Sequence, residues 1–328
     1  MILQGRYVVS RVLQTILTLL VVLTLMFFLF RLVPGDPTAM YVSGRLAPEE
    51  IEAIREAWGL NDPIYIQYFR YVGNLLKGNL GRSFFYRDDV VAIITPRIFN
   101  TLILMGPAML ATVVLGIMAG SYLGWKHGSK TEKAGVIFSL LARSFPVFVS
   151  GVFAMMFLSF YLDLFPLGGM RTVEAKGLTW WQEFLDVAHH MALPFVVTIL
   201  YNVGDVLMIA RTSIIELIGE EFLSFARARG LSPSKISRIA VRNAIIPVLT
   251  YSTIMIGFAF GGQVLVEVVF SWPGVGRLMV DSVTRHDYPV AQATFFLMAM
   301  VVIVLNLVMD LIYVYLDPRI ASEDSTRR

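Results

Sequence analysis

The sequence predicts an all-α integral membrane protein with six transmembrane helices. Three observations support this prediction: 56% of the 328 residues are hydrophobic, only 16% are charged, and the mean hydropathy is +0.69. A soluble fold does not bury so much apolar surface. The low charge excludes a disordered chain, the absence of cysteine excludes a disulfide scaffold and thiolate metal sites, and the net charge of +3 is too mild to indicate nucleic-acid binding.

Each membrane helix needs about 20 apolar residues to cross a hydrocarbon core about 30 Å thick. The first such run is followed by Arg31-Leu32-Val33-Pro34 and not by a small-residue cleavage site, so we expect it to stay in the mature protein. In the third run, Ser144-Phe145-Pro146 predicts a kink. The six runs cover about 12–30, 101–125, 134–162, 193–210, 245–270 and 290–316.

The distribution of lysine and arginine predicts the orientation. The short loops 163–192 and 271–289 hold two basic residues each, whereas the segment 212–244 alone holds five. Cytoplasmic loops carry the excess of positive charge, so we expect both termini in the cytoplasm. The predicted divisions are 1–31 (N-terminus and first span), 32–100 (extracytoplasmic insertion), 101–316 (the other five spans, including the cytoplasmic segment 212–244) and 317–328 (cytoplasmic tail).

Two helices are expected in the extracytoplasmic insertion. Pro48-Glu49-Glu50 is typical of a helix start, and Gly59 follows the last apolar residue of that pattern, Trp58. A second pattern runs over 64–77 and is followed by Gly78. Such helices cap a pore entrance, meet a soluble partner or pack on the membrane surface, and the sequence does not decide among these roles.

The cytoplasmic segment 212–244 is orderly for a loop. Its acidic residues precede Arg227 and Arg229 along one expected helical stretch that Gly230 ends, and Ser232-Pro233 predicts the start of a further helix. A short amphipathic helix between two spans suits docking into a groove of a cytoplasmic partner. An ordinary basic loop is the alternative interpretation.

Polar residues within the spans are candidates for a translocation pathway, because ionisable groups are costly in a membrane. Asp205 either lines a cavity or pairs with Arg143 inside the membrane. An intramembrane aspartyl protease using Asp205 and Asp310 is a remote alternative, since Asn202-Val203-Gly204-Asp205 lacks the first glycine of Gly-x-Gly-Asp. The pathway candidates are Asn202, Asp205, Gln263 and Glu267, with anchoring as the alternative role of Glu267.

Several motifs, spread over the whole chain, resemble those of ABC importer permeases of the dipeptide and oligopeptide family, in the subunit type with a large extracytoplasmic insertion. They are Pro34-Gly35-Asp36-Pro37, Trp58-Gly59-Leu60-Asn61-Asp62-Pro63, Gly78-Asn79-Leu80-Gly81-Arg82-Ser83, Ala226-Arg227-Ala228-Arg229-Gly230-Leu231, Arg242-Asn243-Ala244-Ile245-Ile246-Pro247-Val248, Val266-Glu267-Val268-Val269-Phe270-Ser271-Trp272-Pro273-Gly274-Val275-Gly276, Asp287-Tyr288-Pro289 and Leu316-Asp317-Pro318-Arg319. Ser224-Phe225 departs from the family pattern before Ala226, which implies a different fit to the ATPase.

The resemblance implies a type I importer architecture in a bacterial or archaeal cytoplasmic membrane. It implies a second homologous permease subunit, two P-loop ATPases that bind ATP and Mg, and an extracytoplasmic binding protein. This chain would be non-catalytic and hold no cofactor, because it has no Gly-x-x-x-x-Gly-Lys-Ser/Thr motif. The implied substrates are small peptides, with a nickel chelate, an opine or an oligosaccharide as alternatives. The implied ATPase-coupling residues are Glu220, Glu221, Phe222, Ala226, Arg227, Arg229, Gly230 and Leu231.

Overall fold

The computed structural model describes residues 2–32, 49, 61–172 and 177–316. Most of these residues are helical, and one isolated β-bridge joins Arg82 and Asp89. They form two compact units, residues 1–100 with 274–328 and residues 101–273. The helix predicted from Pro48 to Trp58 and the tail 317–328 lie outside the described residues.

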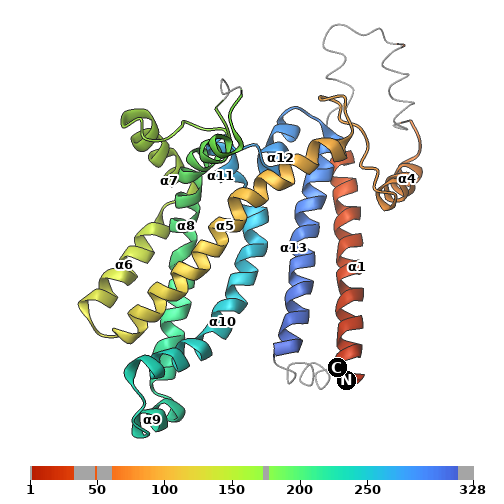
Figure 1. Cartoon of the computed structure of the whole chain (residues 1–328). Coiled ribbons are helices and arrows are strands. Elements are labelled where there is room, and N and C mark those ends of the chain that lie inside the picture. Colours follow the sequence, from red (N-terminus) through yellow and green to blue (C-terminus); the bar gives the residue numbers. More distant parts are fainter. Residues whose placement is uncertain (1, 33–48, 50–60, 173–176, 317–328) are drawn as a thin grey trace. The chain divides into compact units, whose positions relative to one another are not determined.

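In the first unit two long helices run side by side (Figure 1). They are α1 (Ile2–Leu32) and α13 (Tyr288–Leu316), and α12 (Val275–Thr284) packs against α13. The helix α4 (Ile64–Leu76) confirms the second helix predicted in the insertion, and Gly78 follows it with φ +75°. A small core joins the start of α5 (Val90–Trp125) to α12 and α13 through Val90, Ile94, Leu278, Val290 and Ala293.

The end of the insertion is fixed to the start of α13 by Asp287. This carboxylate is fully buried and accepts hydrogen bonds from the Ser83 hydroxyl and from the backbone N–H groups of Phe84 (3.0 Å) and Phe85 (3.2 Å). These hydrogen bonds satisfy the polar atoms of a side chain that is removed from water. The Asp287-Tyr288-Pro289 motif therefore has a structural task, which is to anchor the segment that leads into α5.

The second unit holds the remainder of α5 and most of the other helices. Its core cluster contains Leu104, Met105, Val147, Leu193, Val197, Val266, Phe270 and Trp272. In order, its other helices are α6 (Lys130–Ser144), α7 (Val147–Ala154), the π-helix η1 (Met155–Tyr161), α8 (Trp180–Ile218), α9 (Glu221–Ala228), α10 (Pro233–Gly262) and α11 (Val264–Val269).

A row of glycines lets α5 approach α8 closely. Gly116, Gly120 and Gly124 follow one another at four-residue spacing and so share a face of α5. A Cβ at Gly120 would lie 2.7 Å from the Cβ of Ala210, and a Cβ at Gly124 would lie 2.7 Å from the Cβ of Ile214. Small residues of this kind are typical of helix packing in membranes.

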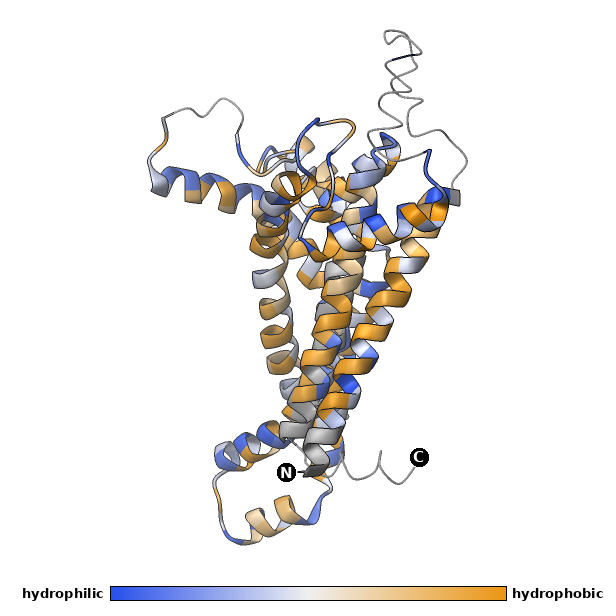
Figure 2. Ribbon diagram, turned by 90° about the vertical axis from the view of Figure 1, so that its right-hand side faces the viewer, coloured by the Kyte–Doolittle hydropathy of each residue, from blue (hydrophilic) through white to orange (hydrophobic). Residues whose placement is uncertain are grey.

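Within the described residues, four helices are long and apolar enough to cross a membrane: 7–31 of α1, α5, α8 and 288–308 of α13. The bent pair of α6 with α7 and η1 makes a fifth candidate. The predicted run 245–270 coincides with α10 and α11. Figure 2 shows hydrophobic residues along the long helices and hydrophilic ones gathered at their ends. The all-α membrane fold is confirmed.

Two predicted details were wrong. The expected kink near Pro146 is a break, with a bend of 92° between α6 and the helices after it. Phe145 is extended (φ −96°, ψ 137°), as residues before proline prefer, so the helix ends there. The expected loop 163–192 is shorter than predicted, because α8 already begins at Trp180, where the Gln182 side chain accepts a hydrogen bond from the Thr179 N–H (3.0 Å).

Candidate functional site

The cytoplasmic segment after α8 contains a break that the sequence analysis did not predict. The expected single helical stretch from Glu216 to Arg229 is wrong, because α8 ends at Ile218 and α9 begins at Glu221. Gly219 and Glu220 form the turn between them, with their N–H groups bonded to the carbonyls of Glu216 and Leu217. The segment α9 is therefore a separate two-turn helix connected at both ends by tight turns.

One face of α9 is held against α8 and α10 by apolar packing. Leu223 and Ala226 are buried in a cluster with Ile214 of α8 and with Ile236 and Ala240 of α10. The predicted coupling residue Ala226 thus has a packing role. This small core fixes the position of α9 relative to two membrane helices.

The C-terminal end of α9 is closed by Gly230, as predicted. Its φ is +73°, a left-handed conformation that side chains with a Cβ rarely adopt. The Gly230 N–H donates to the Arg227 carbonyl (2.9 Å) and the Leu231 N–H donates to the Ala226 carbonyl (3.3 Å). This is the Schellman arrangement, which satisfies the last carbonyls of a helix and reverses the chain.

The opposite face of α9 is exposed. Most of the predicted coupling residues are exposed on this helix or in the turns at its two ends, namely Glu220, Glu221, Phe222, Arg227, Arg229 and Gly230. Phe225 was missed: it is 66% exposed, and the Arg229 guanidinium lies 5.9 Å from its ring centroid. Phe225 lies three residues after Phe222, a spacing that places two side chains close together on a helix, so the sequence did contain a signal for it. Beside α9 lies a hollow of about 570 Å³, lined by Trp125, Arg227, Leu231, Pro233, Ser234, Ile236 and Ser237.

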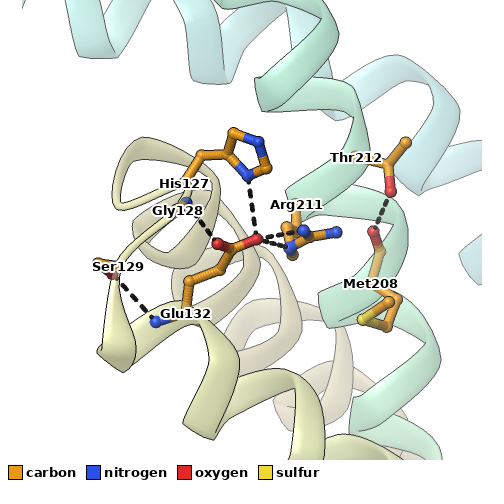
Figure 3. Close-up of polar contacts among 7 residues, drawn as sticks. All are labelled: His127, Gly128, Ser129, Glu132, Met208, Arg211 and Thr212. Carbon is orange, nitrogen blue, oxygen red and sulfur yellow. Dashed lines mark hydrogen bonds and ion pairs between the residues drawn. The ribbon is translucent and has the colours of Figure 1, made fainter.

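A buried ion pair joins Glu132 of α6 to Arg211 of α8, seven residues before the end of α8 (Figure 3). The Glu132 side chain is 5% exposed, and its Oε1 accepts a hydrogen bond from Arg211 Nε (2.7 Å). The Gly128 N–H donates to Oε2 (2.6 Å), and His127 Nδ1 lies 3.1 Å from Oε1. The turn between α5 and α6 is thereby fixed to α8.

This cluster was not predicted from the sequence, although a signal was present. Ser129 and Glu132 have the spacing of a capping box, and the Glu132 N–H donates to Ser129 Oγ (3.2 Å). In a usual capping box the glutamate bonds back to the N-cap N–H, whereas here it bonds to the preceding Gly128 and to Arg211. Local sequence does not indicate a partner that lies 79 residues away.

A second charge pair joins the end of α6 to α8, six residues before Arg211. Arg143, the penultimate residue of α6, forms an ion pair with Asp205 of α8, and the Tyr251 hydroxyl of α10 donates to Asp205 Oδ2 (2.6 Å). The Arg143 guanidinium also lies 5.9 Å from the ring of Tyr201. The pairing considered for Asp205 is present, and both side chains keep exposed surface, 49% for Arg143 and 24% for Asp205.

The other polar candidates of the spans are buried. Asn202 donates to the Thr198 carbonyl (2.8 Å) within α8. Glu267 of α11 accepts a hydrogen bond from Thr101 Oγ1 (2.6 Å), and Gln263 lies in the junction between α10 and α11. Gln263 Oε1 has no hydrogen-bond partner among the described residues.

Comparison with known proteins decides the family. Residues 112–322 match the family described as binding-protein-dependent transport system inner membrane component, and residues 4–105 match the N-terminal part of such components. The chain belongs to this family. It is a multi-pass membrane permease subunit of an ABC importer, a non-catalytic component of a transport complex.

The similarity of this permease to curated relatives extends over nearly the full chain. A probable peptide ABC transporter permease of Sinorhizobium fredii is 34% identical over 318 residues, which is 96% of this chain and 99% of the relative. An oligopeptide transport system permease of Bacillus subtilis is 32% identical, with 96% and 98% covered. A glutathione transport system permease of Salmonella paratyphi A is 34% identical, with 96% and 98% covered.

The protease alternative finds no support in the permease. Its two aspartates are each paired with an arginine, Asp205 with Arg143 and Asp310 with Arg11 (3.5 Å). An aspartic protease needs two carboxylates that share one proton, and neighbouring cations oppose this by favouring the ionised form. No group of three or more potential metal-ligating His, Asp or Glu side chains occurs among the described residues.

Proposed function

We propose that this permease is one of two homologous membrane subunits of an importer that carries small peptides delivered by an extracytoplasmic binding protein. The names of its relatives, which refer to peptides, oligopeptides and glutathione, support the peptide class. Two P-loop ATPases would bind ATP and Mg and supply the energy. The lysine and arginine distribution supports a cytoplasmic location for both termini and for the segment 212–244.

The proposal assigns ATPase coupling to α9, and one observation supports it above the others. A two-turn helix presents two exposed aromatic rings, Phe222 and Phe225, beside exposed Arg227 and Arg229, while its other face is buried against α8 and α10. Aromatic and arginine side chains are the residues that most often anchor protein interfaces. A helix without a partner would gain nothing from exposing these rings to water.

Movement of a docked α9 would reach the membrane through α8 and α10. Leu223 and Ala226 fix the helix to both, and the Schellman turn at Gly230 fixes the direction in which the chain enters α10. Closure of the ATPases would then rotate these membrane helices together with α9. Glu220, Glu221 and Leu231 complete the proposed coupling set.

The proposed pathway through the membrane includes Asp205. The partly exposed surfaces of Asp205 and Arg143, at a level of the spans where charge is costly, favour a role beyond packing. A peptide carries both an ammonium and a carboxylate group, and the two side chains match these charges. Asn202, Gln263 and Glu267 belong to the same proposed pathway set.

The test of coupling is Gly230→Val in the reconstituted importer, assembled from the subunits that co-purify with a tagged chain. A side chain in the left-handed region costs about 1–2 kcal/mol and disturbs the turn. We expect uptake of a labelled tripeptide to fall several-fold while ATP hydrolysis continues. In wild type, an unlabelled dipeptide should compete for this uptake and an oligosaccharide should not.

Gly78→Val is a matched control. Gly78 has φ +75°, and, as at Gly230, a Cβ there would meet nothing within 4 Å, so both substitutions impose the same backbone strain. Gly78 follows α4, far along the chain from α9, and its variant should keep normal coupling. Coupled uptake in Gly230→Val, or equal losses in both variants, would refute the coupling role of this turn.

A further inference from the structure

The helix α4 of the insertion packs against the last turns of α1. The Thr24 hydroxyl donates to the Leu20 carbonyl (2.7 Å) and so accepts a hydrogen bond from the Tyr68 hydroxyl (2.8 Å). The ring of Phe27, itself almost fully buried, lies 5.3 Å from that of Tyr68 and 5.7 Å from that of Tyr71. Burial raises the pKa of Tyr71 to about 12, so its phenol stays neutral.

These contacts fix the depth of α4 in the membrane. The apolar span of α1 ends at Arg31. Thr24 lies seven residues earlier, about 10 Å along the helix axis, and Phe27 lies about 6 Å from Arg31. The tyrosines of α4 therefore lie beside the end of the span and not beyond it. Figure 1 shows α4 beside that end of α1. This is the boundary between acyl chains and headgroups.

The sequence of α4 divides into three faces at about 100° per residue. Tyr68 and Tyr71 form the face toward α1. Next to it lies an apolar face that is exposed, with Phe69 70% and Leu76 82% exposed and Tyr65 on the same side. The polar face lies opposite the apolar one and consists of Gln67, Arg70 and Asn74.

The polar face meets the turn that precedes the helix. Arg70 forms an ion pair with Asp62 (2.7 Å), and Gln67 Nε2 donates to the Asp62 carbonyl (2.7 Å). Among the described residues, no comparable contact covers the apolar face, where Phe69 and Leu76 keep most of their surface exposed. On α1, Leu25 and Leu29 are exposed as well, and they lie at the same level of the helix as Thr24 and Phe27, which contact α4.

We propose that α4 is an interfacial helix seated in the membrane leaflet at the C-terminal end of α1, with Tyr65, Phe69 and Leu76 against lipid acyl chains. The flank of the helix rests on α1 and its polar face is turned to the headgroups and water. An amphipathic helix lying in the membrane plane buries its apolar face about 5–10 Å into this boundary, which matches the depth fixed by α1. The inference goes beyond transport and requires only that α1 spans the membrane.

The absence of cysteine from the chain gives a clean test. Single variants Phe69→Cys and Leu76→Cys carry a nitroxide on the apolar face, and Asn74→Cys carries the same label on the polar face as a matched control. Each chain is placed in phospholipid nanodiscs within the assembled transporter, whose partner subunits are stripped of reactive cysteines. Power saturation then measures collisions with oxygen, which is enriched in lipid, and with a water-soluble nickel chelate.

At positions 69 and 76 we expect the ratio of oxygen to nickel collisions to be several-fold higher than at position 74. Equal nickel access at 69 and 74 would show that the face meets water, and poor access of both reagents at 69 would show that protein covers it. Either result overturns the proposal. Adding the extracytoplasmic binding protein should leave position 69 unchanged, and protection there would instead assign the face to that partner.

Discussion

The two charge pairs that join α6 to α8 have opposite polarity and different surroundings. Near the start of α6, Glu132 is buried with Arg211, and the Gly128 N–H and the His127 ring also contact its carboxylate. At the end of α6, Arg143 pairs with Asp205, but about half of the arginine side chain is exposed. One helix is therefore fixed to its neighbour tightly at one end and loosely at the other.

The difference in burial separates a pair that is expected to stabilise the fold from a pair that is proposed to act in transport. A buried ion pair is strongly destabilising when one partner is removed, because the other charge is left without water or counterion. A partly exposed pair loses little, because solvent or a ligand can replace the missing partner. The Glu132 pair is thus expected to hold the fold, and the Asp205 pair is available to a charged substrate.

The largest effect on stability is expected from Glu132→Ala. It removes the partner of Arg211 and the acceptor of the Gly128 N–H, and should lower the midpoint of thermal unfolding by about 5–10 °C in detergent. The control is Glu183→Ala, which removes an exposed ion pair with Arg171 (3.7 Å) from the same unit. Equal unfolding midpoints for Glu132→Ala and Glu183→Ala would show that the buried ion pair stabilises the protein no more than an exposed one.

A smaller effect on stability, but a larger one on transport, is expected from Asp205→Asn. The amide oxygen can still accept from Tyr251, so the midpoint should move by less than about 2 °C. Uptake of a cationic tripeptide should fall several-fold relative to a neutral one. Asp310→Asn, which removes a similarly exposed carboxylate from Arg11, is the matched control. Unchanged uptake and preference in Asp205→Asn would make the residue structural.

A small effect, on stability alone, is expected from His127→Ala. This side chain is 57% exposed and supplies one of several contacts to Glu132, so its loss should lower the midpoint by about 1–2 °C. The same thermal measurement checks it. A shift as large as that of Glu132→Ala would mean that the histidine, and not Arg211, dominates the buried cluster.

The fold class and the ends of several helices could be predicted because they depend on local signals. Apolar runs identify the spans, Pro233 begins α10, and Gly230 has the left-handed conformation that ends α9. The break at Gly219 could not be predicted as firmly, because its φ of −81° is open to any residue. A proline in an apolar run is also compatible with either a kink or a complete break, so the 92° break at Pro146 could not be predicted.

Most residues of the candidate site could be named from the sequence, but their burial and their partners could not. The exposed residues of α9 were named, whereas Ala226 belongs to the packed face and Phe225 was left out. Glu132 was missed because its partner Arg211 lies 79 residues along the chain. Burial and long-range pairing follow from how helices pack, and that information is not contained in the spacing of residues on one helix.

The construction of α9 has a consequence for how transport complexes diversify. Its position depends on Leu223, Ala226 and Gly230, whereas Phe222, Phe225 and Arg227 contribute their exposed surfaces and little to the fold. The outward side chains can therefore change without unfolding the helix. Under the proposed coupling role, recognition of a particular ATPase would be free to evolve separately from membrane assembly. Related permeases would then share one architecture and still avoid binding each other's ATPases.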